Sequence, residues 1–553
     1  MEDLIREMAS LPFPKFLKLL ETLESDEEAC KKAIIARCAT DIHLFSQIFF
    51  PHYCTFPFNL FHYDTFKDYK YGERAVRRAS AAPRGFAKST IKALIKPIHD
   101  VVYRLEKFIV IVSNTEPQAS QKAKDISTEF LTNNTLKDFY GSWLSGRKVG
   151  ATDFILNQDD FSCRIYAVGS KTEIRGIRFG EARPSKIVCD DVEHSTEVEN
   201  EAIREKYEDW YKEVISKIGD TKTNIEFVGT VLHRKSLLKS LVNNPKYKSR
   251  EYKAIISWSD RPDLWKEWKK IYCNLDDDER QDHALSYFKE NEEEMMKGVE
   301  VLWPEKESYY HLQEEIIETG MRAFMKEKQN SPMSDEEKVF DPEDFWWYEQ
   351  TTENGQEGFL IERTGVFIPL EHLQPLGVID PSTGQKKPSA NVKTDFTCIL
   401  TGYKDPLSKR LFVHADFTKR TSPSKYVRQI FENNEIYQYY RFGIETNLFR
   451  GLLVKNILEE KKRQELNKTM PINIKFYDIV QTENKEKRIY TIEPKVSNGY
   501  ILFNKTMLSQ EFKDQMWEFP KGKHDDCPDA LEMLWSLADN KYKAGSLGRG
   551  MMT

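Results

Sequence analysis

The chain has 553 residues, enough for two or three domains with separate hydrophobic cores. Its 82 Lys and Arg residues are opposed by 88 Asp and Glu residues, and the formal net charge of −6 excludes a uniformly basic nucleic-acid coat. The eight cysteines form no C-x-x-C pair, which argues against a zinc ribbon and against a disulfide framework.

The sequence predicts neither a signal peptide nor a membrane segment. The start, Met1–Glu7, is acidic and lacks the apolar region of a signal peptide. No apolar run reaches the roughly 18 residues needed to span a bilayer. We therefore expect a protein of a reducing cytoplasm that does not contact a membrane.

The predicted elements form two α/β blocks joined by a helical region. Apolar residues at helical spacing predict amphipathic helices over residues 1–48. From about 75 to 235, short apolar runs alternate with helical stretches, which predicts an α/β fold with a parallel sheet covered on both faces. A helical subdomain is expected over 250–335, and a second α/β block from Gly365 to Leu537. The predicted strands of the first block are Ala75–Ala82, Phe108–Val112, Arg164–Val168, Lys186–Cys189 and Asn224–Val228.

A phosphate-binding loop is predicted between the first of these strands and the next helix. Backbone N–H groups at a helix N-terminus favour a phosphate, Lys88 would reach the β- and γ-phosphates, and the Ser89 hydroxyl would bind Mg²⁺. Alanines at 82 and 87 stand where the G-x-x-x-x-G-K-[ST] pattern has glycines, and a purely structural turn is the alternative. The loop consists of Pro83, Arg84, Gly85, Phe86, Ala87, Lys88, Ser89 and Thr90.

Acidic residues follow the strand Lys186–Cys189, where ligands bind in open α/β sheets. Asp190 is predicted to hold Mg²⁺, and Asp191 or Glu193 to activate the attacking water. A solvated acidic strand end is the simpler alternative for each carboxylate. The loop and these acids occur in the order and spacing of an NTPase.

Further acids in the second α/β block predict a metal nuclease. Asp380 and Glu445 each end an apolar strand, Asp395 begins a neighbouring strand, and Asp526 and Asp529 share one face of a helix. Two divalent cations would relieve the repulsion between these carboxylates and suit phosphodiester hydrolysis. Oxygen ligands favour Mg²⁺ or Mn²⁺ over zinc. The predicted metal ligands are Asp380, Asp395, Glu445, Asp525, Asp526 and Asp529, although any one alone could be a helix cap or a strand-end charge.

Strand–acid, strand–Glu and an H-D-D-x-x-D helix after an NTPase core resemble the large subunit of tailed-bacteriophage terminases. The resemblance covers about residues 45–540, and several other segments support it: Ile109–Thr115, Gly229–Arg234, Leu302–Pro304, Phe324–Pro332, Lys485–Ile489 and Gly499–Phe503. It implies a P-loop ATPase with a helical lid, followed by an RNase H-like nuclease. The expected domains are a helical segment at 1–48, the ATPase core at 49–250, the lid and linker at 251–345, the nuclease at 346–540 and a tail at 541–553.

The resemblance also implies roles for single residues. Arg84 would contact the γ-phosphate, and Phe58–Asp64 occupies the place of an adenine-recognition motif, with His62 where glutamine is commoner. In the Gly-containing segment Thr172–Gly180, Arg178 or Arg175 is a candidate arginine finger for the neighbouring subunit of a ring. Pairing with DNA phosphates or surface carboxylates is the alternative for both arginines.

The function expected from the resemblance is an ATP-driven motor that translocates double-stranded DNA into a viral procapsid and cuts concatemeric DNA. Its cofactors would be ATP and Mg²⁺, and Mn²⁺ could replace Mg²⁺ in the nuclease site. Its partners would be the portal protein, a small terminase subunit and further copies in a ring, usually a pentamer. It would act in the cytoplasm of the infected bacterium, docked transiently on the procapsid and absent from the mature virion. A helicase–nuclease of recombination or repair and a non-enzymatic assembly adaptor are the alternatives.

Overall fold

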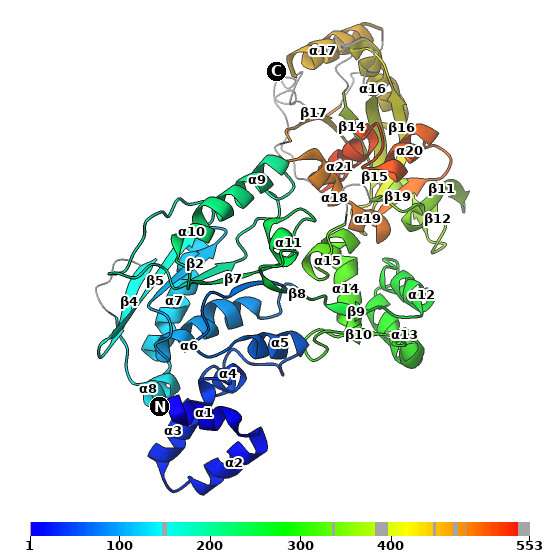
Figure 1. The fold of residues 1–553 in the computed structure, drawn as a ribbon. Coiled ribbons are helices and arrows are strands. Elements are labelled where there is room, and N and C mark those ends of the chain that lie inside the picture. Colours follow the sequence, from blue (N-terminus) through cyan, green and yellow to red (C-terminus); the bar gives the residue numbers. More distant parts are fainter. Residues whose placement is uncertain are drawn as a thin grey trace. The chain divides into compact units, whose positions relative to one another are not determined.

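The structure is a computed structural model that describes residues 2–145, 152–333, 338–381, 396–445, 450–467, 474–481 and 483–539 (Figure 1). The chain divides into two compact units. The first contains Met1–Ser259, Gly298–Ile316 and Met321–Met333, and the second contains Asp260–Lys297, Ile317–Gly320 and Ser334–Thr553. The stretch 251–345, expected to be one lid and linker, therefore contributes to both units. The other expected boundaries stay predictions, and the tail 541–553 lies outside the described residues.

The first unit is built on an eight-stranded sheet in the order β3-β4-β5-β2-β6-β7-β1-β8. The strands from β5 to β8 in this order are parallel, and β4 and β3 add antiparallel strands at the β5 edge. All five strands predicted in this block are present, as β1, β2, β5, β6 and β7. The strands are β1 (Arg77–Ala81), β2 (Phe108–Ser113), β3 (Leu144–Ser145), β4 (Asp153–Gln158), β5 (Phe161–Gly169), β6 (Lys186–Asp190), β7 (Asn224–Gly229) and β8 (Lys248–Glu251).

Helices cover both faces of this sheet, as predicted. Successive residues of a strand point to opposite faces, so Ile109 and Ile111 of β2 enter one core and Val110 and Val112 enter the other. The first core contains α4 (Ile42–Phe49), η1 (Thr90–Ile95), α6 (Lys96–Val102), α7 (Glu116–Thr132) and α8 (Asn134–Tyr140). The second contains α9 (Glu201–Trp210), η2 (Tyr211–Ile215), α10 (Ser216–Ile218) and α11 (Leu237–Val242).

Helices at the chain start and a short lid segment complete the first unit. The predicted N-terminal helices are present as α1 (Glu2–Ser10), α2 (Phe13–Thr22), α3 (Glu27–Cys38) and α4, and α5 (Leu60–Asp68) follows them. The lid segment consists of β9 (Ile255–Ser257), β10 (Glu300–Val301), most of α14 (Tyr309–Thr319) and α15 (Met321–Glu327). None of the helices that the structure describes is both long enough and apolar enough to cross a membrane.

The second unit is built on a nine-stranded mixed sheet in the order β13-β12-β11-β19-β16-β15-β14-β17-β18. β14, β15 and β16 are antiparallel neighbours, whereas β17 and β18 run parallel to β14. This five-strand arrangement is that of an RNase H-like domain, as expected. The strands are β11 (Trp346–Glu353), β12 (Gln356–Ile361), β13 (Phe367–Pro369), β14 (Gln374–Asp380), β15 (Thr397–Lys404), β16 (Leu411–Lys419), β17 (Arg441–Glu445), β18 (Phe476–Ile479) and β19 (Ile501–Asn504).

Helices on opposite faces of β14 form two cores of the second unit. Val378 packs with buried residues of α21 (Asp526–Ala538), and Ile379 packs with those of α16 (Pro423–Tyr437). The remaining helical elements are α12 (Pro262–Tyr272), α13 (Arg280–Met295), η3 (Pro342–Asp344), η4 (Leu370–His372), α17 (Arg450–Asn467), α18 (Lys485–Tyr490), α19 (Glu493–Ser497) and α20 (Gln510–Glu518).

The α12–α13 hairpin belongs to this second unit, although it lies well before the strands of that unit in the sequence. Cys273, after α12, joins the apolar cluster of Trp346 and Phe412. Arg410, before β16, pairs with Asp276 of the hairpin turn. The hairpin's apolar and ionic partners therefore come from the second unit, whereas the lid segment of 251–345 belongs to the first.

Candidate nucleotide and nuclease sites

The predicted phosphate loop leaves the carboxyl end of β1 and leads into η1. Gly85 and Ala87 both have positive φ values, +87° and +53°. Ala87 therefore has the backbone geometry that the glycine of the usual pattern supplies, although this left-handed conformation is uncommon for alanine. The substitution of the pattern's glycine therefore leaves the turn of the loop intact.

Lys88 points its ammonium into the carboxyl edge of the first sheet. Its Nζ donates to Thr230 Oγ1 at 2.5 Å and to the Ala82 carbonyl at 3.3 Å, and it lies 3.6 Å from Asp191 Oδ1. Thr230 lies in the segment Gly229–Arg234, one of the segments that support the resemblance. The Lys88 side chain is buried, so water screens its positive charge little and an anion that enters the loop would interact with that charge.

Ser89 and Asp190 meet at this edge, as expected of a Mg²⁺ site. Ser89 Oγ donates to Asp190 Oδ1 at 3.0 Å, and Lys122 Nζ lies 2.6 Å from Asp190 Oδ2. Burial and the neighbouring Asp191 raise the pKa of Asp190, while Lys122 and Ser89 oppose them. A hydroxyl and a carboxylate beside a phosphate loop are the oxygen donors that suit Mg²⁺. Lys122, from α7, was not predicted, because no local pattern marks one lysine of a polar helix.

The two candidates for activating water have different surroundings. Asp191 is exposed, has a φ of +49° and faces Lys88. Glu193 is buried, and its carboxylate accepts hydrogen bonds from the backbone of Leu237 at 2.8 Å and Leu238 at 2.9 Å. Burial raises the pKa of Glu193 to about 7, against the effect of these two amides. Asp191 therefore lies beside Lys88, whereas the Glu193 carboxylate is hydrogen-bonded to the first backbone N–H groups of α11.

Arg84 and His62 both have partners within the described part of the chain, and the role that the resemblance implies for Arg84 stays a prediction. The Arg84 guanidinium lies 3.6 Å from the Glu327 carboxylate, and its backbone N–H donates to the Glu327 carbonyl at 2.9 Å. His62 is fully buried; its Nδ1 accepts from Asn59 N and its Nε2 donates to the Phe86 carbonyl at 3.1 Å. Burial and the nearby Lys306 lower the pKa of His62 to about 4. His62 thus supports the phosphate loop as a neutral ring.

The two candidate finger arginines differ in their partners. Arg175 lies 3.3 Å from Glu213, and both side chains are largely exposed. Arg178 is exposed, and among the described residues its guanidinium has no ion pair. The alternative of surface carboxylate pairing therefore fits Arg175, and Arg178 remains available to a partner.

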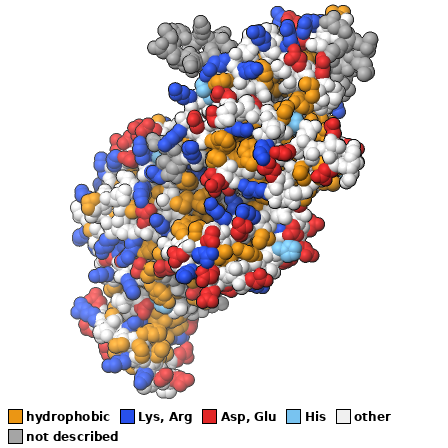
Figure 2. Space-filling view, turned by 90° about the vertical axis from the view of Figure 1, so that its right-hand side faces the viewer, with side chains coloured by type: hydrophobic (Ala, Val, Ile, Leu, Met, Phe, Trp, Pro, Cys, Tyr) orange, Lys and Arg blue, Asp and Glu red, His pale blue; other side chains and the backbone are white. Residues whose placement is uncertain are grey.

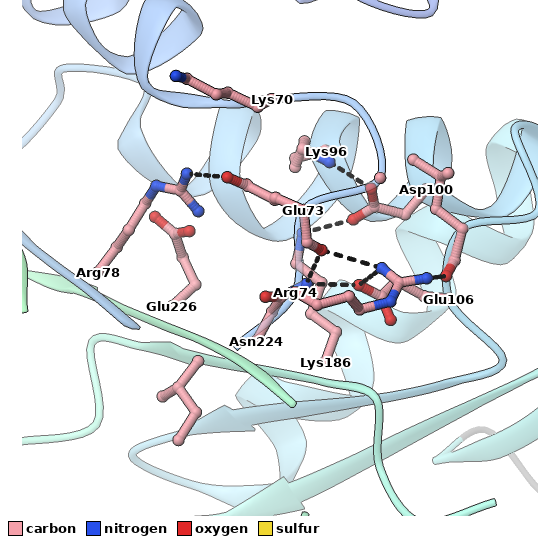
Figure 3. A pocket seen from close by; sticks show the side chains of 13 residues that line it. Lys70, Glu73, Arg74, Arg78, Lys96, Asp100, Glu106, Lys186, Asn224 and Glu226 are labelled. Atoms are coloured by element: carbon pink, nitrogen blue, oxygen red, sulfur yellow. Dashed lines mark hydrogen bonds and ion pairs between the residues drawn. The ribbon is translucent and has the colours of Figure 1, made fainter. Parts of the chain in front are cut away.

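A buried charge cluster lies at the amino edge of the same sheet (Figure 3). Lys96 and Lys186 both pair with Asp100, and Arg78 pairs with Glu73. The cavity between these side chains measures about 10 Å³, which is about the space of a single water molecule. This cavity is therefore too small for a nucleotide, and the predicted site lies at the other, carboxyl edge of the sheet.

The nuclease carboxylates come together at the ends of β14 and β17 and the start of α21. Asp380 and Asp526 are buried. Burial raises the pKa of Asp380 well above its usual range, the neighbouring Asp529, Glu445 and Asp526 raise it further, and Lys485 opposes them. Burial and Asp529 likewise raise the pKa of Glu445. These carboxylates were predicted to lie together, and in the structure Asp380 and Glu445 are close enough to other carboxylates for their charges to interact.

Two basic side chains of α18 lie among these carboxylates. Lys485 Nζ lies 2.8 Å from Asp525, 3.3 Å from Asp529 and 3.9 Å from Asp380. Arg488 lies 2.8 Å from Asp529 and 2.6 Å from Glu532. Lys485–Ile489 is one of the segments that support the resemblance, but the sequence did not predict that α18 supplies these positive charges.

The metal ligands predicted for this site stay a prediction, because Asp395 is not among the described residues. Within the described part of the chain, no three His, Cys, Asp or Glu side chains are arranged to hold a metal ion. Lys485 supplies the positive charge there, Asp525 and Asp529 are engaged in ion pairs, and Asp395 lies outside the described residues. The donor set of Asp380, Glu445 and Asp526 still suits a divalent cation, because carboxylate oxygens are the ligands that Mg²⁺ and Mn²⁺ prefer, and the raised pKa values of Asp380 and Glu445 reflect charges that repel one another.

Basic and acidic side chains alternate over the face shown in Figure 2. This mixture agrees with the small net charge of the chain. Any DNA contact on this face would use local groups of basic residues.

Comparison with known proteins finds no matching family model and no matching curated protein. Among solved structures, the chain is similar to the large terminase of a thermophilic bacteriophage, at 9% identity and a TM-score of 0.38, over 87% of this chain and 99% of that chain. It is similar to the large terminase of bacteriophage HK97 at 11% identity and a TM-score of 0.29, over 87% and 95% of the two chains. The human cytomegalovirus terminase nuclease domain matches 32% of this chain and 90% of its own, at 14% identity and a TM-score of 0.24.

These structures belong to the family that the sequence motifs resemble. Their identities and TM-scores are low, so the geometry of the two sites is the basis for assigning a function.

Proposed function

We propose that this chain is the large subunit of a viral DNA-packaging terminase. It would use ATP hydrolysis to move double-stranded DNA into a procapsid and would cut concatemeric DNA with a metal-dependent endonuclease. The observation that carries the proposal is the pairing of two sites on one chain: Ser89 bonded to Asp190 beside Lys88, and Asp380, Glu445 and Asp526 on an RNase H-like sheet.

In the first site, the chain's own residues would bind and orient the nucleotide. Lys88 would exchange its Thr230 and Ala82 contacts for phosphate oxygens, and Asp191, which faces Lys88, would orient the attacking water. Ser89 and Asp190 would hold Mg²⁺, which neutralises phosphate charge when bound. Glu193 would act as a positioning residue, because its carboxylate joins the segment after Asp191 to α11.

In the second site, Asp380, Glu445 and Asp526 would hold the divalent cations. Bound Mg²⁺ or Mn²⁺ supplies charge neutralisation at a phosphodiester. Lys485 and Arg488 would orient Asp525, Asp529 and Glu532 around that set.

The proposed assembly follows from the proposed function. The protein would work as a ring, usually a pentamer, on the portal of the procapsid, with a small subunit that selects DNA. It would act in the infected cell's cytoplasm and leave before the virion matures.

The experiment that tests the proposal separates the two activities. Lys88→Ala should abolish ATP hydrolysis and leave DNA cutting in Mg²⁺ or Mn²⁺ largely intact, whereas Asp380→Ala should do the reverse. Lys326→Ala is the matched control, since Lys326 pairs with Glu199 on the surface. Wild-type ATP turnover by Lys88→Ala would refute the nucleotide site.

The same measurements distinguish the alternatives. A chain that binds ATP but never hydrolyses it, with or without DNA, would be an assembly adaptor. Strand unwinding without packaging into purified procapsids would indicate a helicase–nuclease.

A further inference from the structure

Three successive residues of the phosphate loop are held through their backbones by three separate segments. The Arg84 N–H donates to the Glu327 carbonyl, and the Phe86 carbonyl accepts from His62 Nε2. Between them, the Gly85 carbonyl accepts a hydrogen bond from Lys306 Nζ. Two of these contacts come from the lid segment, so the loop and the lid are in direct contact on one side of the nucleotide site.

Lys306 is positioned by an aromatic cluster. Its Nζ lies 4.9 Å from the centre of the Trp303 ring, and that ring packs on His62 at 4.6 Å and on Phe86 at 5.5 Å. Trp303 is buried, and its indole N–H donates to the Pro57 carbonyl at 2.8 Å. Lys306 therefore lies on a turn that Trp303 anchors, through Phe86 of the loop and through the Pro57 carbonyl.

The ammonium of Lys306 has no carboxylate of its own among the described residues. Glu307, one of the two acids adjacent in sequence, pairs with Lys328 Nζ at 2.7 Å. Burial lowers the pKa of Lys306, and Lys328 lowers it further, against the effect of Glu307. An ammonium has three N–H donors, and one is used by the Gly85 carbonyl. The remaining donors and the positive charge can bind an anion at this point.

We propose that Lys306 is a second phosphate-binding lysine, which binds the terminal phosphate of ATP from the lid side while Lys88 binds from the sheet side. This inference rests on the proposed ATP site and adds a residue to it. Lys306 Nζ and Glu307 Oε1 both lie close to Gly85, because a Cβ built there would be 3.5 Å from the first and 3.7 Å from the second.

The position of Lys306 on the loop gives it a preference for the triphosphate. The loop amides that lead into η1 and Lys88 serve the phosphates nearest the helix. Lys306 contacts Gly85, three residues before Lys88. A diphosphate bound at the helix start would therefore not reach Lys306, which would stay hydrogen-bonded to the Gly85 carbonyl. Loss of the terminal phosphate would then return Lys306 to Gly85, and the lid segment would respond to the nucleotide state.

The test compares nucleotide affinities of the full chain. Fluorescent ATPγS and fluorescent ADP are titrated, with Mg²⁺, into wild type, Lys306→Met, Lys306→Arg and the control Lys326→Met. We expect Lys306→Met to weaken triphosphate binding about tenfold or more, the effect of losing a hydrogen bond to a charged group, with ADP binding nearly unchanged. Lys306→Arg, which keeps the charge, should recover part of the loss. Thermal melts without nucleotide check that each variant is folded.

The outcomes separate this inference from the function it rests on. If wild type binds neither nucleotide, the proposed ATP site and the role of Lys306 both fail. If Lys88→Ala loses the triphosphate but Lys306→Met binds it as wild type does, only the Lys306 assignment fails. Equal weakening of both nucleotides by Lys306→Met would show that the lysine supports the loop and does not bind the terminal phosphate.

Discussion

The guanidinium of Arg410 donates hydrogen bonds to both carboxylate oxygens of Asp276, at 2.5 and 3.0 Å, although 134 residues separate them. Arg410 is fully buried, and the Asp276 side chain is 15% exposed. A buried guanidinium needs such a partner, because its desolvation is costly. The pair therefore fixes the α12–α13 hairpin to the sheet that carries the nuclease carboxylates.

Removing one member of this pair should destabilise the second unit strongly. We expect Asp276→Ala to lower the free energy of unfolding by about 3–5 kcal/mol, since it leaves a buried charge unpaired. Urea unfolding followed by circular dichroism measures the loss. Lys266→Ala, which breaks the exposed pair with Glu343, is the control and should cost less than about 1 kcal/mol. Equal losses in the two variants would contradict the structural role of Arg410.

A fragment of about residues 350–545 would lack Asp276, so Arg410 would have no carboxylate of the hairpin to pair with. It should be poorly stable, and Arg410→Met should stabilise it by removing the unpaired charge.

Lys485 should act as the cation of the nuclease cluster when no metal ion is bound. Lys485→Met leaves Asp380, Asp525 and Asp529 without their nearest ammonium, so we expect a lower melting temperature without divalent ions. Added Mn²⁺ should raise the melting temperature of this variant more than that of wild type, because binding to the folded state stabilises it. Lys487→Met, on the same helix, is the control. A Mn²⁺ shift equal to that of wild type would show that Lys485 does not compensate the charge of the metal ligands.

His62 should make the first unit sensitive to acid. Its pKa is about 4 in the folded chain against the ordinary 6.5, so unfolded chains bind the proton first as the pH falls. The stabilisation from a neutral His62 is complete above pH 6.5 and is lost as the pH falls toward 4, by at most about 3 kcal/mol. His62→Gln should remove this part of the pH dependence, which is measured by urea unfolding at pH 7 and pH 5. The exposed His311 provides the control variant, and identical pH profiles for wild type and His62→Gln would refute the prediction.

Arg178 should act on a neighbouring subunit if the chain forms the proposed ring. Arg178→Ala should bind nucleotide but lose ATP hydrolysis by roughly 10³-fold or more. Mixing it with Lys88→Ala, which keeps the arginine, should restore part of the activity at concentrations that allow assembly. Arg175→Ala, whose arginine pairs with Glu213, is the matched variant. If no activity returns while sedimentation shows mixed rings, Arg178 does not act in trans.

Local patterns were sufficient to predict the strands that carry both sites. β6 and β14 are short apolar runs that end in acids, and such a run can be recognised from neighbouring residues alone. The phosphate loop was predictable for the same reason, even with Ala87 in place of glycine, since the turn chemistry is local.

Contacts between distant segments could not be predicted in this way. Glu193 and Asp191 look equivalent in sequence, and only the position of α11 engages Glu193. The position of Lys485 among the carboxylates depends on where α18 packs against α21. The pairing of β19 with both β16 and β11 and the transfer of α12–α13 to the second unit depend on tertiary packing, which no local pattern encodes.

The distance in sequence between Asp276 and Arg410 has a consequence for synthesis on the ribosome. At about 5–20 residues per second, translation of the 134 residues between them takes roughly 7–27 s. For part of that interval the α12–α13 hairpin is complete while β11, the first strand it packs against, does not yet exist. Contacts of Trp265 with Trp268 and Phe288, at 5.3 and 5.7 Å, lie within the hairpin and can hold it together over this time. The nuclease sheet would then be completed against a helical hairpin made before it.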